Sequence, residues 1–233
     1  MKSIAIITAR GGSKRIPKKN IKEFCGKPII AYSIEAAIAS GVFDEVMVST
    51  DSEEIAVIAK QYGANVPFFR SRATSNDFAT TADVLNEVLY EYKNMGKEYD
   101  TMCCIYPTAP FVTAEKLSKA IQFLSESEAD SLIPVVQFSF PPQRGLVIVD
   151  GKTQYASPEC ANSRSQDLQP MYHDCGQFYV CKVKAFEQQK TLVMHNTIPF
   201  VMPDEEVQDI DSLSDWALAE VKYKTFILEE GGK

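Results

Sequence analysis

A basic loop near the start of the chain has the residue types that bind phosphate groups. Residues 9–20 read ARGGSKRIPKKN and follow a short apolar run at residues 3–8. Two adjacent glycines let the backbone turn sharply and bring its N–H groups close to anionic oxygens, while Arg and Lys side chains supply the countercharge. Ile16 precedes a proline and is pushed toward extended geometry, so we expect the loop to lie open across a polyphosphate instead of starting a helix.

The spacing excludes two common phosphate-binding motifs and leaves one alternative. A Walker A loop needs GxxxxGK followed by Ser or Thr, whereas here Pro28 follows the GK pair and Ile21 stands where the first glycine should be. The GxGxxG motif is absent as well. A solvated basic surface loop is the alternative, because most charge runs are of that kind.

The distribution of charge favours a binding site. The formal net charge is −7, and subtracting the six positive charges between Arg10 and Lys22 leaves −13 on the remainder, so positive charge is concentrated in this segment. Open α/β sheets bind ligands at the carboxyl ends of their strands, where this loop is expected to lie. A nucleic-acid partner is disfavoured because the basic residues form one compact loop in an acidic chain.

The loop and several later segments resemble the acylneuraminate (CMP-nonulosonate) cytidylyltransferases. The resemblance runs nearly end to end, and within the family the pattern is most similar to the members that activate pseudaminic acid. The segments that carry it are ARGGSKRIPKKNIK (9–22), GKPIIAYSIEAA (26–37), VSTDSEEIA (48–56), Arg70, YPTAP (106–110), RSQ (164–166), GQFY (176–179) and DID (209–211).

The resemblance implies an enzyme that transfers CMP from CTP to the anomeric hydroxyl of a nonulosonic acid, most closely pseudaminic acid, with release of pyrophosphate. N-acetylneuraminic, legionaminic and 3-deoxy-manno-octulosonic acid stay open as acceptors. A nucleotide-binding module without catalysis is a more distant alternative, and the presence of Lys19 together with both aspartates of the DID segment argues against it.

Displacement of pyrophosphate concentrates charge on the phosphates, so cations and a divalent metal can lower the barrier without a nucleophilic side chain. Lys19 matches the family's catalytic lysine, Asn20 matches its nucleotide-binding asparagine, and Arg10 is a further catalytic candidate. Arg70 and Arg72 compete for one position beside the nucleotide. The expected nucleotide-binding residues are Arg10, Gly11, Gly12, Ser13, Lys14, Lys19, Asn20, Arg70, Thr80 and Thr81, with Asp83 next to them.

Asp209 and Asp211 are the candidate metal ligands and complete the catalytic set. They are separated by one residue, so both side chains of an extended segment point the same way and can reach one hard cation. The alternative is a pair of carboxylates that caps the final helix, expected from about Ser212. In the family that the chain resembles, this DxD sequence holds Mg²⁺.

The carboxylate of an α-keto acid sugar needs a fork-like cation, and Arg164 with Gln166 matches the family's RxQ. Tyr106 and Cys175 stand where sialic acid enzymes commonly have Gln and Asn, which favours a different nonulosonic acid. His173 and Asp174 could orient the substrate or move a proton, although such a pair is more often structural. The expected sugar contacts are Tyr106, Thr108, Arg164, Gln166, Cys175, Gln177 and Tyr179.

Alternating apolar runs predict βαβ units in a mostly parallel, Rossmann-like nucleotidyltransferase sheet flanked by helices. Thr50 with Glu53 has the spacing of a capping box, and Asp51 is expected to cap the same helix. Strands are predicted at 3–8, 45–49, 66–69, 101–106, 131–137, 177–183 and 197–201, and helices at 28–40, 52–62, 80–93, 113–126 and from about 212.

After residue 137 the alternation stops. Asp150-Gly151 lies between strand-like runs at 146–149 and 153–156, which is a strong hairpin signal. Since the related family carries a dimerisation arm here that reaches toward the partner's active site, we interpret residues 138–172 as an inserted arm in a single domain spanning 1–233. A homodimer is expected. A surface hairpin without a partner is the alternative.

Six cysteines without a CxxC spacing are expected to be reduced core thiols of a cytoplasmic protein. The first apolar run is about six residues long and too short for the core of a signal peptide. No membrane-spanning run is visible, so a membrane partner is not expected.

Overall fold

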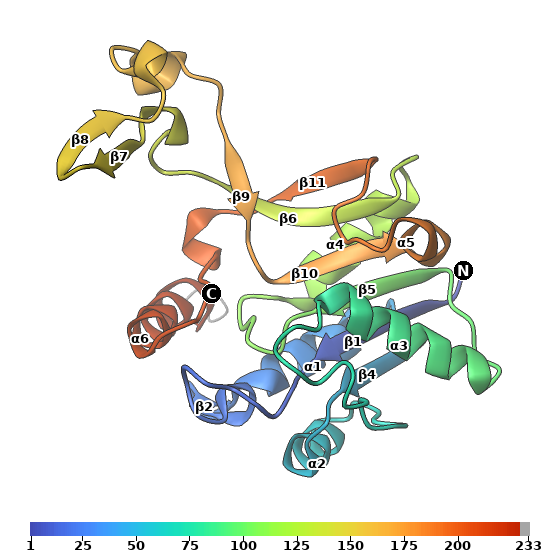
Figure 1. Cartoon of the computed structure of the whole chain (residues 1–233). Coiled ribbons are helices and arrows are strands. Elements are labelled where there is room, and N and C mark those ends of the chain that lie inside the picture. Colours follow the sequence, from blue (N-terminus) through green and yellow to red (C-terminus); the bar gives the residue numbers. More distant parts are fainter. Residues whose placement is uncertain (229–233) are drawn as a thin grey trace.

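The computed structural model describes residues 1–228, and a seven-stranded sheet forms its centre (Figure 1). The strand order is β11-β6-β10-β5-β1-β4, and β9 pairs with β6. The strands are β1 (Ser3–Thr8), β4 (Glu45–Ser49), β5 (Thr101–Ile105), β6 (Ser131–Gln137), β9 (Tyr172–Asp174), β10 (Phe178–Lys182) and β11 (Thr197–Val201). Two short strands, β2 (Glu23–Phe24) and β3 (Lys27–Pro28), pair with each other beside it.

Five of the seven strands (β1, β4, β5, β6 and β11) run in the same direction, and β9 and β10 run in the opposite one. The pairs β1–β4, β1–β5 and β6–β11 are parallel, whereas β10 is antiparallel to both β5 and β6. The carboxyl ends of β1, β4 and β5 therefore lie along one edge of the sheet, which brings the connections that follow them together. The predicted α/β class with a mostly parallel sheet is confirmed.

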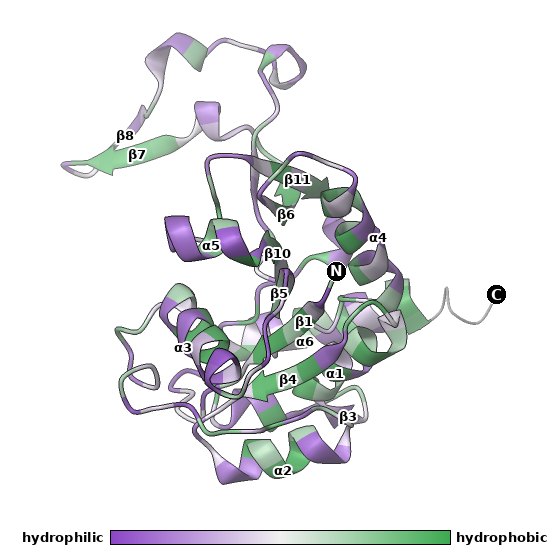
Figure 2. Ribbon diagram, turned by 90° about the vertical axis from the view of Figure 1, so that its right-hand side faces the viewer, coloured by the Kyte–Doolittle hydropathy of each residue, from purple (hydrophilic) through white to green (hydrophobic). Residues whose placement is uncertain are grey.

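Helices cover both faces of the sheet, so its central strands β1 and β5 are buried on both sides. Ala5 and Ile7 of β1 belong to one core with α1, α2 and α4, whereas Ile4 and Ile6 belong to a second core with α3 and α5. Figure 2 shows the apolar strands β1 and β4 between α3 and α1. The helices are α1 (Ile29–Ser40), α2 (Glu53–Gln61), α3 (Thr81–Asn94), α4 (Ala114–Ser125), α5 (Val183–Gln189) and α6 (Leu213–Lys222), followed by a π-helical turn at Tyr223–Leu228.

A third, aromatic cluster fastens the carboxyl-terminal helix to the start of the chain. The Phe24 ring contacts Tyr32, Trp216 and Tyr223 edge to face, with ring centroids 5.5–5.6 Å apart. Ile16 from the basic loop and Ile210 from the DID segment are both buried in the same cluster. Two segments almost the whole chain apart are thereby held side by side.

The predicted strand at 66–69 is wrong. An isolated bridge between Met47 and Asn65 forms just before this segment, but residues 66–69 form no strand. Pro67 has no N–H group to donate to a ladder, so its apolar neighbours cannot continue the pairing. The other predicted strands and helices are confirmed, with ends within about two residues.

The predicted capping residues of α2 are also wrong. Ser52, not Thr50 or Asp51, caps this helix, because the Ser52 hydroxyl accepts from the Ile55 N–H at 3.4 Å. The Thr50 hydroxyl instead accepts from the Ser52 N–H at 3.1 Å. The Asp51 carboxylate is turned away from the helix and accepts from the Gly11 N–H at 2.8 Å.

The hairpin predicted after residue 137 is present. Strands β7 (Leu146–Val149) and β8 (Lys152–Tyr155) pair across Asp150 and Gly151, whose φ angles of 51° and 73° are those of a tight hairpin turn. All residues of both strands are exposed, and Figure 1 shows the hairpin standing away from the sheet beyond β9. That this hairpin serves as a dimerisation arm remains a prediction.

No helix within residues 1–228 combines the length and the apolar character needed to cross a membrane. All six cysteines are free thiols; Cys103, Cys104, Cys175 and Cys181 are buried, and Cys25 and Cys160 are partly exposed. The expectation of core thiols is therefore confirmed for four of them.

We expect Phe24→Ala to lower the free energy of unfolding by about 3–5 kcal/mol, because a fully buried aromatic ring would be replaced by a cavity. Phe123→Ala is the matched control, since Phe123 is 48% exposed on α4. Its effect should stay within about 0.5 kcal/mol. Urea unfolding followed by circular dichroism measures both, and equal losses would contradict the role of the aromatic cluster.

Candidate active site

The basic loop lies at the carboxyl end of β1 and opens onto a cleft of about 400 Å³. The loop contains no α-helix, only a short 3₁₀ turn at Lys19–Ile21, so the expected open conformation is confirmed. Five predicted loop residues and two predicted sugar contacts line this cleft: Arg10, Ser13, Lys14, Lys19, Asn20, Tyr106 and Thr108.

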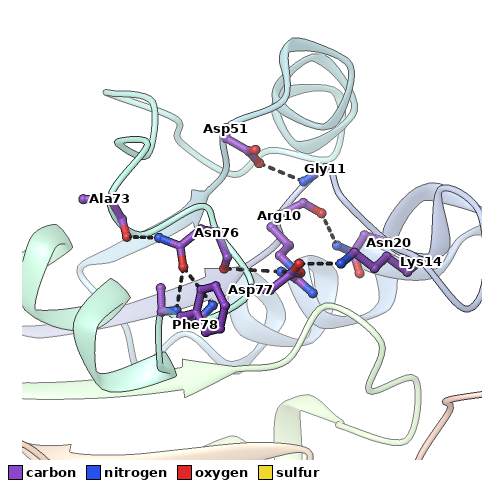
Figure 3. Close-up of polar contacts among 10 residues, drawn as sticks. Arg10, Gly11, Lys14, Asn20, Asp51, Ala73, Asn76, Asp77 and Phe78 are labelled. Carbon is purple, nitrogen blue, oxygen red and sulfur yellow. Dashed lines mark hydrogen bonds and ion pairs between the residues drawn. The ribbon is translucent and has the colours of Figure 1, made fainter.

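Backbone contacts hold the glycine turn against α2. The Gly11 N–H donates to Asp51, and a Cβ added at Gly11 would lie 3.1 Å from the Ser52 Cβ, so a larger residue would press on the helix start. The Asn20 side chain is buried and donates to the Arg10 carbonyl at 2.9 Å. Gly12 has open space around it. Figure 3 shows the contacts of Gly11 with Asp51 and of Asn20 with Arg10.

Lys19 lies against the DID segment. Its ammonium donates to the Ile210 carbonyl at 2.8 Å and is 3.6 Å from the Asp211 carboxylate, which also pairs with Arg15 at 2.6 Å. Burial raises the pKa of the Asp209 carboxyl, and the negative charge of Asp211 raises it further. Arg15 and Lys19, which line the cleft, thus lie beside two carboxylates that are not part of the cleft wall.

Neither aspartate caps α6. Ser212 is the N-cap, its hydroxyl accepts from the Asp215 N–H, and Asp215 returns a bond to the Ser212 N–H, which completes a capping box. The capping alternative for Asp209 and Asp211 is therefore wrong.

The two carboxylates suit Mg²⁺, which is usually held by one or two protein carboxylates together with substrate phosphates. Within residues 1–228 no group of three or more His, Cys, Asp or Glu side chains could hold a metal ion. A metal at Asp209 and Asp211 would thus complete its coordination with water and with oxygens of the substrate.

Arg70 lines a second cavity of about 220 Å³ that shares Thr8 and Arg10 with the main cleft; Thr80 and Thr81 also line it. The Arg70 guanidinium is buried and donates to the Ser49 carbonyl at 2.7 Å and to the Ser49 hydroxyl at 3.1 Å. Burial lowers its pKa. Arg72 is exposed and does not line this cavity, so of the two competing arginines only Arg70 faces the candidate site.

Thr80 and Thr81 begin α3 at the edge of this cavity. The Thr80 hydroxyl and the Asp83 carboxylate form a capping box, and these bonds from Thr80 lower the pKa of Asp83. The Thr81 hydroxyl lies 3.4 Å from that of Tyr106 and links α3 to the main cleft.

Tyr179 and Asp174 support Tyr106 from behind. The Tyr179 hydroxyl donates to Asp174 at 2.7 Å, and its ring packs edge to face on Tyr106 with centroids 5.4 Å apart. Burial raises the pKa of Tyr179, so this hydroxyl keeps its proton. His173 is exposed, and its ring nitrogen lies 3.0 Å from the Asp174 carbonyl.

Five predicted sugar contacts lie outside the cleft wall, and Tyr179, described above, is one of them. Gln177 is buried behind it, donates to the Glu206 carbonyl at 2.7 Å, and its side-chain oxygen has no hydrogen-bond partner within residues 1–228. Cys175 is also buried, which raises the pKa of its thiol to about 12. Arg164 and Gln166 belong to the 138–172 segment, where Arg164 pairs with Asp167 at 2.7 Å.

Two acidic residues at the loop were not among the predicted site residues. Asp51 accepts from the Gly11 N–H, and Asp77 pairs with Arg10 at 2.8 Å and with Lys14 (Figure 3). Asp51 was noticed only as a capping candidate. Asp77 had no signal in the sequence, because it lies in a polar segment without periodicity.

A doubly covered, mostly parallel sheet with a basic glycine loop after its first strand and two aspartates beside that loop is the arrangement of a nucleotidyltransferase. The sequence pattern of the cytidylyltransferase family matches residues 4–214. The chain belongs to this family and is an enzyme of the nucleotidyltransferase class.

Curated relatives of similar length share much of their sequence with this chain. The chain is 40% identical over 225 residues to the pseudaminic acid cytidylyltransferase of Campylobacter jejuni subsp. jejuni serotype O:2, covering 96% of this chain and 97% of the relative. It is 33% identical to the CMP-N,N'-diacetyllegionaminic acid synthase of Legionella pneumophila, covering 94% and 95%.

Solved structures share the fold. A CMP:2-keto-3-deoxy-manno-octonic acid synthetase complexed with CTP superposes with a TM-score of 0.67 at 18% identity, covering 96% of this chain and 98% of the other. A 4-diphosphocytidyl-2C-methyl-D-erythritol synthase from Anaerococcus prevotii gives 0.66 at 15% identity, with the same coverage. At such identities the likeness concerns the fold alone.

The raised pKa of Asp209 predicts that Asp209→Asn stabilises the protein in the absence of divalent cations. A carboxyl whose folded-state pKa is raised costs stability once pH exceeds the ordinary value of 3.8, so the gain should be complete above the raised pKa and vanish below pH 3.8. Partial exposure screens the repulsion, so we expect at most about 1 kcal/mol.

Denaturant unfolding in a chelator from pH 3 to 8 measures this difference. Asp215→Asn is the control of opposite sign, because hydrogen bonds from Ser212 lower the pKa of Asp215 and its loss should destabilise the fold at neutral pH. A destabilised Asp209→Asn variant at pH 7 would contradict the described environment of Asp209.

Proposed function

We propose that this protein transfers CMP from CTP to the anomeric hydroxyl of pseudaminic acid and releases pyrophosphate. The observation that carries this proposal is the position of Lys19, which lines the cleft and whose ammonium lies 3.6 Å from the Asp211 carboxylate. The 40% identity to a pseudaminic acid cytidylyltransferase over nearly the whole chain supports the choice of reaction.

In this reaction the sugar oxygen attacks the α-phosphorus of CTP in line with the departing oxygen. The new bond to the sugar forms as the bond to pyrophosphate breaks, and the hydroxyl proton passes to solvent or to a base. Negative charge grows on the departing pyrophosphate, so fixed cations near it lower the barrier. Arg10, Ser13, Lys14 and Lys19 line the cleft in which such a group would lie.

Asp209 and Asp211 would hold Mg²⁺ through their carboxylates, and the ion would supply further positive charge at the phosphates. Arg15 now pairs with Asp211 at 2.6 Å, so binding of a cation there would compete with this pair. Arg70, Thr80 and Thr81 are assigned to the nucleoside side, because their cavity joins the phosphate side at Arg10.

The sugar is assigned to the side of the cleft lined by Tyr106 and Thr108. We further propose a homodimer, in which Arg164 and Gln166 of a second copy reach this side and bind the sugar carboxylate. Within one chain both residues stand on the exposed 138–172 segment, whose hairpin carries the apolar side chains of Leu146 and Ile148 in solvent. The free, largely buried thiols suit a reducing compartment, and we propose a cytoplasmic location.

The acceptor is tested by pyrophosphate release from CTP, Mg²⁺ and a panel of nonulosonic acids. We expect pseudaminic acid to exceed N-acetylneuraminic acid by orders of magnitude in kcat/KM, because a pocket with buried polar partners strongly rejects a sugar that leaves them unpaired. If legionaminic or 3-deoxy-manno-octulosonic acid is used as efficiently as pseudaminic acid, the assignment as a cytidylyltransferase would stand, but the assignment of pseudaminic acid as the acceptor would be contradicted. Binding of CTP without turnover of any sugar would favour a non-catalytic module.

Lys19→Ala should lower kcat by roughly 10²-fold or more, because it removes a cation from the charge that develops in the transition state. Lys119→Ala on the exposed face of α4 is the control, as this lysine pairs only with Glu115 of its own helix in the described contacts. Wild-type turnover by a folded Lys19→Ala variant would contradict the assigned role.

A further inference from the structure

The connection between α2 and α3 carries a carboxylate that contacts the basic loop. Asp77 Oδ1 accepts from Arg10 Nη1 at 2.8 Å, and Asp77 Oδ2 accepts from the Lys14 ammonium. The same Arg10 nitrogen also reaches the Asn76 carbonyl at 3.4 Å. Figure 3 shows Arg10 and Lys14 converging on this one side chain. Asp77 therefore bridges two of the cations proposed to bind the nucleotide.

The second half of this connection, from Ser71 to Thr80, is fixed to α3 at both of its ends. At one end the Ser71 N–H and hydroxyl donate to the Glu87 carboxylate, each at 2.7 Å, and the Thr74 hydroxyl donates to it as well. At the other end Thr80 and Asp83 form the capping box of the helix. The residues between these anchors form the tip, 75–79.

Among the described residues, hydrogen bonds from the tip to the protein outside the connection run only to Arg10 and Lys14. Within the tip, Asn76 Oδ1 accepts from the N–H groups of Phe78 and Ala79 at 2.8 and 3.0 Å, which gives the tip its own local turn. Phe78 is 94% exposed. The tip can therefore move away from the basic loop as a unit once the ion pairs of Asp77 with Arg10 and Lys14 break.

The nucleotide competes with Asp77 for the same groups. A triphosphate presents several anionic oxygens to Arg10 and Lys14, whereas Asp77 presents one carboxylate. The hydrogen bonds from these two cations lower the pKa of Asp77, so it is fully charged at neutral pH. Two anions cannot both occupy the near side of the same cations without strong repulsion.

We propose that Asp77 is a positioning residue that holds Arg10 and Lys14 in place of phosphate oxygens until the nucleotide displaces it and frees the tip. This inference rests on the proposed function, because it takes the loop as the polyphosphate site. The proposal implies that the loop is selective for highly charged ligands, since only an anion with enough charge displaces Asp77 from Arg10 and Lys14. It also implies that Asp77 assists the release of pyrophosphate by pairing again with the vacated cations.

Isothermal titration calorimetry of the full chain with CTP and with pyrophosphate, both with Mg²⁺, tests the competition. Asp77→Asn should bind both ligands about two- to tenfold more tightly, the range expected for the loss of two exposed ion pairs. Glu54→Gln is the matched control: it makes the same change in net charge and removes the partner of Lys18, a loop cation that does not line the main cleft. Its affinities should stay within about twofold of the parent.

Release of the tip is tested by fluorescence of a Phe78→Trp variant, whose new indole would sit in solvent beside Asp77. CTP should change the emission of this variant. When Asp77→Asn is added to Phe78→Trp, the emission spectrum without ligand should shift toward that of the CTP-bound Phe78→Trp variant. Circular dichroism reports folding, and the exposed position of Asp77 makes the substitution mild.

These outcomes distinguish a failure of the proposed function from a failure of the proposed role of Asp77. No CTP binding by the parent would overturn the proposed function and this inference with it. CTP binding by the parent together with unchanged or weaker binding by Asp77→Asn would overturn the inference alone. An emission of the Phe78→Trp variant that CTP leaves unchanged would contradict the release of the tip.

Discussion

The site depends on the burial of Ile16 and Ile210 in one aromatic cluster. These residues stand beside charged groups, Arg15 in the loop and Asp211 in the DID segment, and both isoleucines are 1% exposed. Since moving either one into solvent would expose a full apolar side chain, the loop and the DID segment cannot drift apart without a cost of about 2 kcal/mol or more. Apolar burial thus helps to fix the distance between the cations and the carboxylates, together with the hydrogen bond from Lys19 to the Ile210 carbonyl and the Arg15–Asp211 ion pair.

Within that frame the charges are arranged in pairs. Arg10 and Lys14 share Asp77, and Arg15 and Lys19 share Asp211. Four cations so close together would repel one another, and the two carboxylates remove much of that repulsion. Burial, and after it the charge of Asp211, raises the pKa of Asp209, so its charged form costs stability, as is common where a protein binds a ligand at the expense of stability.

Local features of the sequence predicted most of the fold. Apolar periodicity predicted six of the seven strands of the sheet, all but β9, and its five long helices. The Asp150-Gly151 pair predicted the hairpin because both residues adopt the positive φ angles that a tight hairpin turn requires. Periodicity failed at Val66, where a proline that cannot donate to a ladder follows directly. The capping-box spacing misplaced the cap of α2, since several polar residues before that helix have suitable side chains and the tertiary environment selects one.

The sequence by itself determined the elements, the basic glycine loop and the pair of aspartates, because each depends on residues close together in the chain. The tertiary structure decided which of these groups meet. It placed Lys19 against Asp211, chose Arg70 over Arg72 for the second cavity, and brought Asp77 onto Arg10. These pairs join residues tens to nearly two hundred positions apart, and such distances are set by the order of the strands and by burial of the aromatic cluster, neither of which is written in any short segment.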